Sequence, residues 1–347
     1  MDAEKVTKPG PTGPEKPTLI EKLLNILPGN YFLKCLIFWI IFGTPGMLLT
    51  RYLDTLDFER TVELFAQFAP QSIIIFSIPN FAMPLYAFYG TGYMRKSIVK
   101  AVPEMESVTA NGKNTLNTIF KPVSRLAPAL VLAVLFAVIS IISFPGQTQH
   151  VAGVFSLIIK IGGFTFSALG YGTFIWAYSS SISGLHQLGK HHLHFVSFYE
   201  DSHMGMKPLG SVALSLAWVY FFGFGLVFFS ANPVPAPLLL VSLGLILLGI
   251  AFFFLPLRIV HEKMKKEKHA AEKLLRKNLS QIVASLDSKS ESSNEITNLL
   301  AFQMLEQKVS KISEWPFDTI TLSWFSAIII TVLGTIITRY LLIFLGL

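Results

Sequence analysis

The sequence predicts an all-α, polytopic membrane protein with seven transmembrane helices, and three observations support this fold class. Hydrophobic residues make up 52% of the 347 residues, whereas charged residues make up 14%, against about 25% in a typical soluble domain. Mean hydropathy is +0.55, and the chain contains 30 phenylalanines. Seven separate stretches are apolar over the roughly 20 residues that a helix needs to cross a bilayer. This composition leaves too few polar residues to cover a soluble protein of this length.

The chain opens with residues 1–17, a polar and proline-rich segment whose composition predicts a disordered cytoplasmic tail. Residues 18–257 are predicted to hold the first six transmembrane helices, because six apolar stretches of sufficient length occur there. These spans are expected near Tyr31–Leu49, Gln71–Tyr93, Leu126–Phe144, Val151–Ser179, Leu209–Ser230 and Pro235–Leu257. The fourth apolar stretch is overlong and is expected to project into the cytoplasm, as far as Leu188.

Residues 258–318 are predicted to form a helical cytoplasmic anchor region. The sixth span continues into it as one long helix, because apolar residues recur there at helical spacing. That stripe consists of Leu274, Leu275, Leu279, Ile282, Val283 and Leu286. The polar segment 287–294 then ends the helix.

A second cytoplasmic helix is expected over Glu295–Ile312, and it also carries apolar residues at helical spacing. Its stripe includes Leu299, Leu300 and Met304. We predict that this stripe joins subunits, because an apolar face beneath a membrane must pack against another surface. Pro316 disfavours helix at the preceding residue, so the segment Trp315–Asp318 breaks the chain. The seventh transmembrane helix follows within residues 319–347.

Basic residues are distributed unevenly over the connecting loops. Residues 258–318 contain eleven Lys or Arg, and the loop after the second span is also rich in them. The loops 145–150 and 231–237 contain no Lys, Arg, Asp or Glu. Because cytoplasmic loops carry the excess of Lys and Arg, the even-numbered loops are predicted to be cytoplasmic. This orientation places the N-terminus inside and the C-terminus outside, in a multi-pass protein of the plasma membrane.

Composition and motifs argue against several classes of function. The net charge is +7, but the basic residues lie between hydrophobic spans, which indicates a cytoplasmic membrane surface and not a nucleic-acid partner. The single cysteine, Cys35, excludes an intrachain disulfide framework and a multi-cysteine metal cluster. The sequence contains no Walker loop and no HExxH pattern, so we expect neither an enzyme nor a cofactor.

Five histidines cluster between the fourth and fifth spans: His186, His191, His192, His194 and His203. Imidazole is a common metal ligand, but no Asp, Glu or Cys lies among the first four. A solvated helix end is the simpler interpretation, and we predict no metal site.

Two polar residues within the predicted spans are candidates for a ligand pocket. Lys160 lies about ten residues into the fourth span, where a charge costs roughly 3 kcal/mol or more on insertion scales. Either its side chain reaches the outer interface, or it lines a polar pocket in the outer half of the bundle. Asn80, with Pro79 and Pro84 nearby, is the candidate partner from the second span.

The last residues of the chain are Arg339, Tyr340, five apolar residues with the sequence LLIFL, Gly346 and Leu347. This ending resembles the closing motif of the insect gustatory and odorant receptors and the wider superfamily of seven-transmembrane ion channels. That motif is Thr-Tyr, five hydrophobic residues and Gln-Phe. Tyr340 and the apolar residues match it, whereas Arg339, Gly346 and Leu347 differ from it.

The resemblance extends to topology and implies a function. In that superfamily the last helix is divided into an anchor piece and a pore piece, which here correspond to Glu295–Ile312 and Thr319–Leu345. The resemblance implies a homotetrameric ligand-gated ion channel whose seventh helix lines the pore and whose anchor helices join the subunits. It also implies a small-molecule pocket among the outer halves of the second to sixth spans. The residues expected near the outer constriction are Ile343, Phe344, Gly346 and Leu347.

Arg339 and Tyr340 have two interpretations. Aromatic residues gather at the level of lipid headgroups, so Tyr340 favours an interfacial position at which Arg339 contacts lipid phosphate. If Arg339 instead faces a pore, its four copies form a positive ring that favours anions. Two other functions stay open: a small-molecule transporter, and a membrane scaffold or sensor that acts through the cytoplasmic helices.

Overall fold

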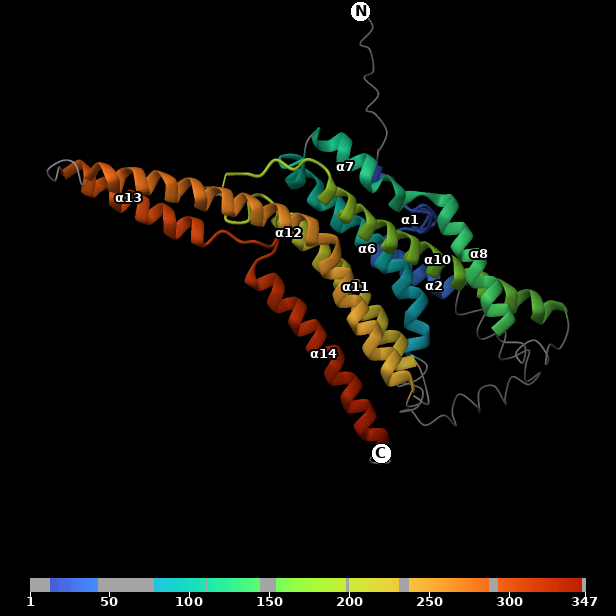
Figure 1. Ribbon diagram of the computed structural model, residues 1–347. Coiled ribbons are helices and arrows are strands. Elements are labelled where there is room, and N and C mark those ends of the chain that lie inside the picture. The colour runs from blue at the N-terminus through green and yellow to red at the C-terminus, as the bar shows by residue number, and fades with distance from the viewer. Residues whose placement is uncertain are drawn as a thin grey trace, which may run out of the picture. The chain divides into compact units, whose positions relative to one another are not determined.

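The computed structural model in Figure 1 describes residues 13–42, 78–109, 111–143, 154–197, 200–230, 237–286 and 293–344. Within these ranges the chain is all-helical, as the sequence predicts, and its one extended pairing is an isolated bridge between Thr109 and Leu193. In chain order the elements are η1 (Gly13–Glu15), α1 (Leu19–Leu24), α2 (Tyr31–Phe42), α6 (Ile78–Glu106), α7 (Gly112–Phe120), η3 (Lys121–Ser124), α8 (Leu126–Ser143), α10 (Val154–Lys190), α11 (Lys207–Ser230), α12 (Pro237–Leu286), α13 (Ser293–Ser310) and α14 (Thr319–Phe344).

Four helical stretches in the described ranges are long and apolar enough to cross a membrane. They are Gly112–Ile139, Lys207–Phe228, Leu240–Gln281 and Thr319–Thr338. They overlap the third, fifth, sixth and seventh predicted spans. Long apolar helices of this kind indicate a membrane protein whose surface contacts lipid. The count of seven spans and the orientation of the termini stay predictions.

The other three predicted spans lie partly outside the described residues. The first corresponds to the short apolar helix α2, and its remainder, 43–49, is not described. The second and fourth correspond to α6 and α10, and the residues that open these two predicted spans, 71–77 and 151–153, are also outside the described ranges.

Helix α6 continues past Tyr93, where the predicted second span ends, to Glu106. Arg95 and Lys96 end the apolar stretch but not the helix, because buried apolar residues recur beyond them at spacings of three and four. These residues are Ile98, Ala101, Val102 and Met105. Such a pattern is typical of an amphipathic helix that leaves the membrane with one face still packed.

The chain divides into two compact units. The first unit comprises the described parts of Met1–Val99, Asn117–Ile182 and Trp218–Gly249. The second comprises the described parts of Lys100–Leu116, Ser183–Ala217 and Ile250–Leu347.

The core of the first unit near its N-terminus is aromatic. Phe88 of α6 is fully buried beside Ile20 and Leu24 of α1. Its ring packs edge-to-face against Phe38 and Phe166, with ring centroids 5.6 and 5.1 Å away. Aromatic pairs of this geometry contribute about 0.5–1.5 kcal/mol each beyond the area that they bury.

A glycine lets α8 and α10 approach closely in the same unit. A methyl group added at Gly172 of α10 would overlap backbone atoms of Ala133 and would lie 2.9 Å from the Ala129 carbonyl oxygen. Small residues at such crossings are typical of helices that pack within membranes.

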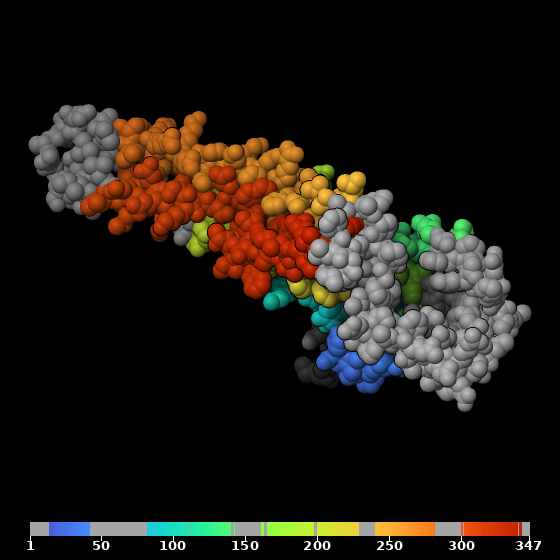
Figure 2. Space-filling view, turned by 90° about the horizontal axis from the view of Figure 1, so that it is seen from below, coloured from blue at the N-terminus to red at the C-terminus, as the bar shows by residue number. Residues whose placement is uncertain are grey.

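In the second unit, α13 lies beside the second half of α12 and runs in the opposite direction (Figures 1 and 2). Val309 and Ile312 pack on Ala271 and Leu275 of α12. Leu275 is one of the residues whose spacing predicts this long helix. Leu274, from the same predicted stripe, is exposed.

Candidate functional site

The base of helix α14 is the candidate functional site, because four sets of contacts in the second unit fix it. Residues 311–318 leave α13 as a non-helical link, and α14 begins at Thr319, as the sequence predicts. The link, α11 and α12 supply these contacts.

Asp318 forms the polar contact. One carboxylate oxygen accepts a hydrogen bond from the backbone N–H of Thr321, at 2.8 Å, and so caps the first turn of α14. The other carboxylate oxygen lies 2.9 Å from Nζ of Lys207, the first residue of α11. The hydrogen bond from Lys207, followed by those from Thr321, holds the pKa of the Asp318 carboxyl below its usual range.

Gly210 provides the closest backbone contact. A methyl group added at this position would overlap the carbonyl oxygen of Pro316 and would lie 2.9 Å from Cβ of Phe317. Only glycine therefore lets the first turn of α11 lie directly against the link.

Stacked aromatic rings provide the apolar contact. The rings of Phe253 in α12 and Phe325 in α14 are nearly parallel, with centroids 4.0 Å apart. Phe253 also lies against Phe317 of the link, at 5.5 Å. All three side chains are buried, so α12 holds both the link and the second turn of α14 through one cluster.

His261 and Trp315 cover the link on its polar side. Their rings stack with centroids 4.0 Å apart and an interplanar angle of 11°. Nδ1 of His261 lies 2.7 Å from the carbonyl oxygen of Glu314, and the Glu314 carboxylate pairs with Lys268 at 3.3 Å. The residues that break the helix are thus positioned by α12.

Beyond its base, α14 has few contacts with the described part of the chain. In its most apolar 18-residue window 17% of the residues are buried, as in the stretch Gly112–Ile139, compared with 44% for α11. The buried residues lie on one side of the helix: Phe325, Ile328 and Ile336. Large apolar side chains such as Trp324 and Ile330 are exposed, so most of this helix is available to lipid or to other chains.

The exposed side of α14 carries a line of small residues that we call the small face. Its members are Ser323, Ala327, Thr331, Gly334 and Thr338, and all five are exposed. The Thr331 hydroxyl donates to the carbonyl oxygen of Ala327, at 2.8 Å. A methyl group added at Gly334 would meet no atom within 4 Å, so no described residue covers the small face at this position.

The predicted pore residues lie at the end of α14. Tyr340 is half-buried and follows the buried Ile336 by one turn, which places it on the packed side of the helix and not on the small face. Arg339, Ile343 and Phe344 belong to α14, but their side chains are outside the described part of the chain. Gly346 and Leu347 also lie outside the described residues.

The structure does not show whether the predicted ligand residues meet. Asn80 lies in α6 and Lys160 in α10, and neither side chain belongs to the described part of the structure. For the predicted assembly residues, the side chains of Leu300 and Met304 are exposed on α13. The side chain of Leu299 is not described.

The histidines after α10 do not converge. The rings of His192 and His194 stack with centroids 5.9 Å apart, and Nδ1 of His203 lies 3.7 Å from a carboxylate oxygen of Asp201. Among the described residues, no three His, Cys, Asp or Glu side chains are grouped so that they could hold a metal ion.

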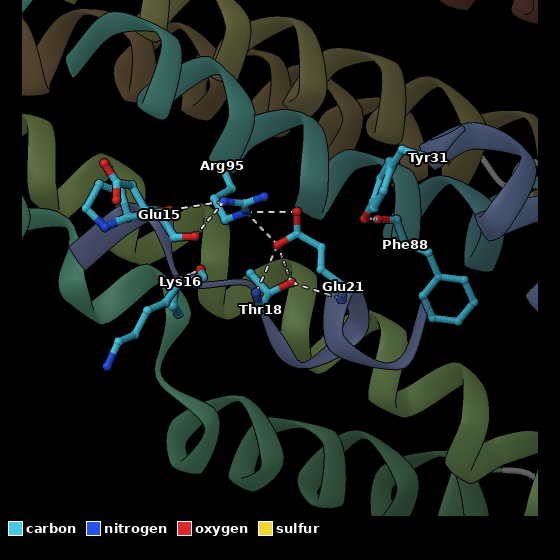
Figure 3. A network of polar contacts seen from close by, with 9 residues as sticks. Glu15, Lys16, Thr18, Glu21, Tyr31, Phe88 and Arg95 are labelled. Atoms are coloured by element: carbon cyan, nitrogen blue, oxygen red, sulfur yellow. Dashed lines mark hydrogen bonds and ion pairs between the residues drawn. The ribbon is translucent and has the colours of Figure 1, made fainter. Parts of the chain in front are cut away.

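A buried ion pair in the first unit is a feature that the sequence analysis missed (Figure 3). Nε of Arg95 lies 2.8 and 2.6 Å from the two carboxylate oxygens of Glu21, and the two side chains are 15% and 4% exposed. Glu21 also accepts from the backbone and hydroxyl of Thr18, which completes a capping box at the start of α1. The spacing Thr18-x-x-Glu21 is a local signal for that cap, but nothing local identifies Arg95.

The same network fixes the segment before α1. Arg95 donates to the carbonyl oxygens of Pro14 and Glu15, at 3.3 Å each, and the Ser124 hydroxyl donates to that of Lys16, at 2.7 Å. Residues 13–17, which the sequence assigns to the end of a disordered tail, are therefore bound to α6 and η3. Residues 1–12 of that predicted tail lie outside the described ranges.

Comparisons with protein-family models, with curated proteins and with solved structures found no match to this chain.

Proposed function

We propose that this chain is the subunit of a homo-oligomeric, ligand-gated ion channel of the plasma membrane, in which α14 lines the pore. The observation that supports the proposal is the contrast within α14, between a base held by α11 and α12 and a small face that is exposed in the described part of the chain. A pore helix needs both properties, because it must keep its position while it presents one side to the lumen.

The chemistry of the small face suits a water-filled lumen. Serine and threonine hydroxyls on it can accept hydrogen bonds from water while they donate to helix carbonyl oxygens, as Thr331 does. Short side chains let several copies of the helix approach one axis and still leave room for an ion. The large apolar residues beside this face, such as Trp324, would then meet lipid or a neighbouring subunit.

Assembly is assigned to the cytoplasmic helices. Leu300 and Met304 of α13 and Leu274 of α12 are exposed apolar side chains in the region 258–318 that the sequence assigns to the cytoplasm. Burying one such side chain against a second copy stabilises the assembly by about 2 kcal/mol, and symmetry repeats the contact in every subunit. The number of four subunits is part of the proposal and comes from the resemblance to the receptor-channel superfamily.

Gating is assigned to the outer end of α14 and to a pocket among the other spans. Ile343, Phe344, Gly346 and Leu347 would form an apolar constriction that closes by excluding water. Arg339, one turn before it, would either contact lipid phosphate or form a positive ring. Asn80 and Lys160 are the candidate ligand residues in the outer half of the bundle.

Ion flux from liposomes that contain the full chain tests the proposal. Gly334→Leu should reduce flux at least tenfold, because a large side chain on the small face would narrow the lumen, and its Cβ atom would meet no atom within 4 Å. Gly244→Leu is the matched control, since an added methyl group there also meets no atom within 4 Å but lies on α12. Equal losses of flux in both variants would exclude α14 as the pore helix. Transport of a small solute without any ion flux would instead support the alternative function of a transporter.

A further inference from the structure

We infer that one face of α12, just beyond its apolar part, binds the phosphate groups of anionic membrane lipids. Six exposed basic residues define this basic face: Arg258, Lys265, Lys266, Lys273, Arg276 and Lys277. The inference concerns a surface outside the proposed pore and does not depend on channel activity.

Helical spacing places the six residues on one side of α12. Lys265 and Lys266 follow Arg258 by two turns, and Lys273 follows Lys266 by two further turns. The residues half a turn away, Val260 and Met264, are fully buried in the second unit. The basic face therefore points away from the protein.

Other basic residues of α12 have partners in the chain, which distinguishes them from the basic face. Nζ of Lys263 donates to the carbonyl oxygen of His191 at 2.7 Å, and Lys268 pairs with Glu314 at 3.3 Å. Two carboxylates lie along this face: Glu262 pairs with Arg258 at 3.0 Å, and Glu272 lies 3.3 Å from Nδ1 of His269. The six positive charges exceed these two carboxylates by four, so the face attracts anions from outside the chain.

The position of this face along α12 favours lipid over an acidic protein. Leu255 lies one turn before Arg258 on the same side, and 57% of its surface is exposed. Along the exposed side of α12, apolar residues are thus followed within one turn by basic residues. A membrane lipid has the same order from the bilayer centre outwards, with its acyl chains first and its phosphate group second.

The distances along α12 agree with the positions of the acyl chains and the phosphate groups in a bilayer. At 1.5 Å per residue, Arg258 lies about 5 Å beyond Leu255, and Lys265 and Lys266 lie about 15 Å beyond it. The headgroup layer on each side of a bilayer is roughly 5–8 Å thick, and lysine side chains bridge several ångströms more. Arg258, Lys265 and Lys266 are therefore the residues within reach of lipid phosphate, and the later three extend the positive surface.

Titration of the full chain in neutral detergent with short-chain phosphatidylglycerol, read by native mass spectrometry, tests the inference. Wild type should bind this anionic lipid and not short-chain phosphatidylcholine. Each lysine near an anionic surface contributes about 1 kcal/mol, or about fivefold, so Lys265→Gln with Lys266→Gln should weaken binding about 30-fold. Lys265→Arg with Lys266→Arg should retain it.

The matched control removes two exposed lysines from the first unit, Lys16→Gln with Lys22→Gln, and gives the same change in net charge. This control should bind phosphatidylglycerol as wild type does. Equal weakening in both glutamine variants would show that net charge alone decides binding and would overturn the assignment to α12. Wild type that binds the two lipids equally, or neither, would overturn it as well, and the face would then fit an acidic protein.

Discussion

Lys207 and Asp318 join the first residue of α11 to the residue that precedes α14, with 2.9 Å between the ammonium nitrogen and a carboxylate oxygen. The second carboxylate oxygen of Asp318 caps α14 through the N–H of Thr321. One side chain thus both starts the last helix and fixes its position against α11. Since the proposed pore depends on a fixed α14, this residue is the first place to perturb it.

Replacing Asp318 should separate its two roles. Asp318→Ala removes the cap and the ion pair, and loss of an N-cap side chain costs about 1 kcal/mol. Asp318→Asn keeps a good cap and loses only the charge. Thermal unfolding of the full chain in detergent should therefore rank wild type above Asp318→Asn and Asp318→Ala lowest. Equal midpoints for the two variants would mean that the cap does not stabilise the helix.

Acid should weaken the same contact. The pKa of the Asp318 carboxyl is lowered in the folded chain, chiefly by the hydrogen bond from Lys207, whereas an unfolded Asp titrates near about 4. A lowered folded pKa stabilises the fold above the unfolded value, and this stabilisation is lost as the pH falls through about 4 towards the folded pKa. The difference in unfolding midpoint between wild type and Asp318→Asn should shrink over that range. A difference in unfolding midpoint that does not change with pH would contradict a lowered pKa of the Asp318 carboxyl in the folded chain.

The ion pair between Glu21 and Arg95 should be important for stability, because both side chains are largely buried. Removing one partner of a buried pair leaves the other charge uncompensated, at a cost of about 3–5 kcal/mol. Arg95→Met should therefore lower the unfolding midpoint strongly and expose residues 13–17 to proteolysis. Lys22→Gln, which changes an exposed charge in the same helix α1, should change neither property. Resistance of Arg95→Met to proteolysis would show that other contacts hold the segment.

Gly210 and Gly225 offer a matched pair of substitutions in α11. Glycine to alanine in an exposed helix position normally stabilises by up to about 1 kcal/mol. Gly225→Ala should behave in this way, because an added methyl group there meets no atom within 4 Å. Gly210→Ala should instead destabilise, because the methyl group would overlap the Pro316 carbonyl oxygen. If both variants are stabilised, α11 does not approach the link as closely as the structure shows.

Local sequence signals predicted the helices better than the contacts between them. The start of α14 at Thr319 follows from the proline two residues before Asp318, and the continuity of α12 follows from apolar residues at helical spacing. The sequence places the end of the second span near Tyr93 and predicts nothing about the helix beyond it, whereas α6 continues to Glu106. Buried Met94 and Ile98 show that an amphipathic helix continues beyond Tyr93.

Contacts between distant residues could not be predicted in this way. Glu21 and Arg95 are 74 positions apart, and only the packing of α1 on α6 brings them together. The same is true of Gly210 with the link and of Phe253 with Phe325. A single charged residue near the end of a span, such as Arg95, is equally consistent with a position at the membrane interface and with a buried ion pair. Only the identity of its ion-pair partner decides between the two.

Cysteine accessibility along α14 tests the central claim that this helix lines an ion pore. Gly334→Cys and Thr338→Cys lie on the small face, Ile336→Cys lies on the buried side, and the native Cys35 is buried. A charged thiol reagent should block ion flux through the first two variants and leave Ile336→Cys and wild type unaffected. Equal reaction of all three positions, or reaction of Gly334→Cys and Thr338→Cys without any change in flux, would contradict the account.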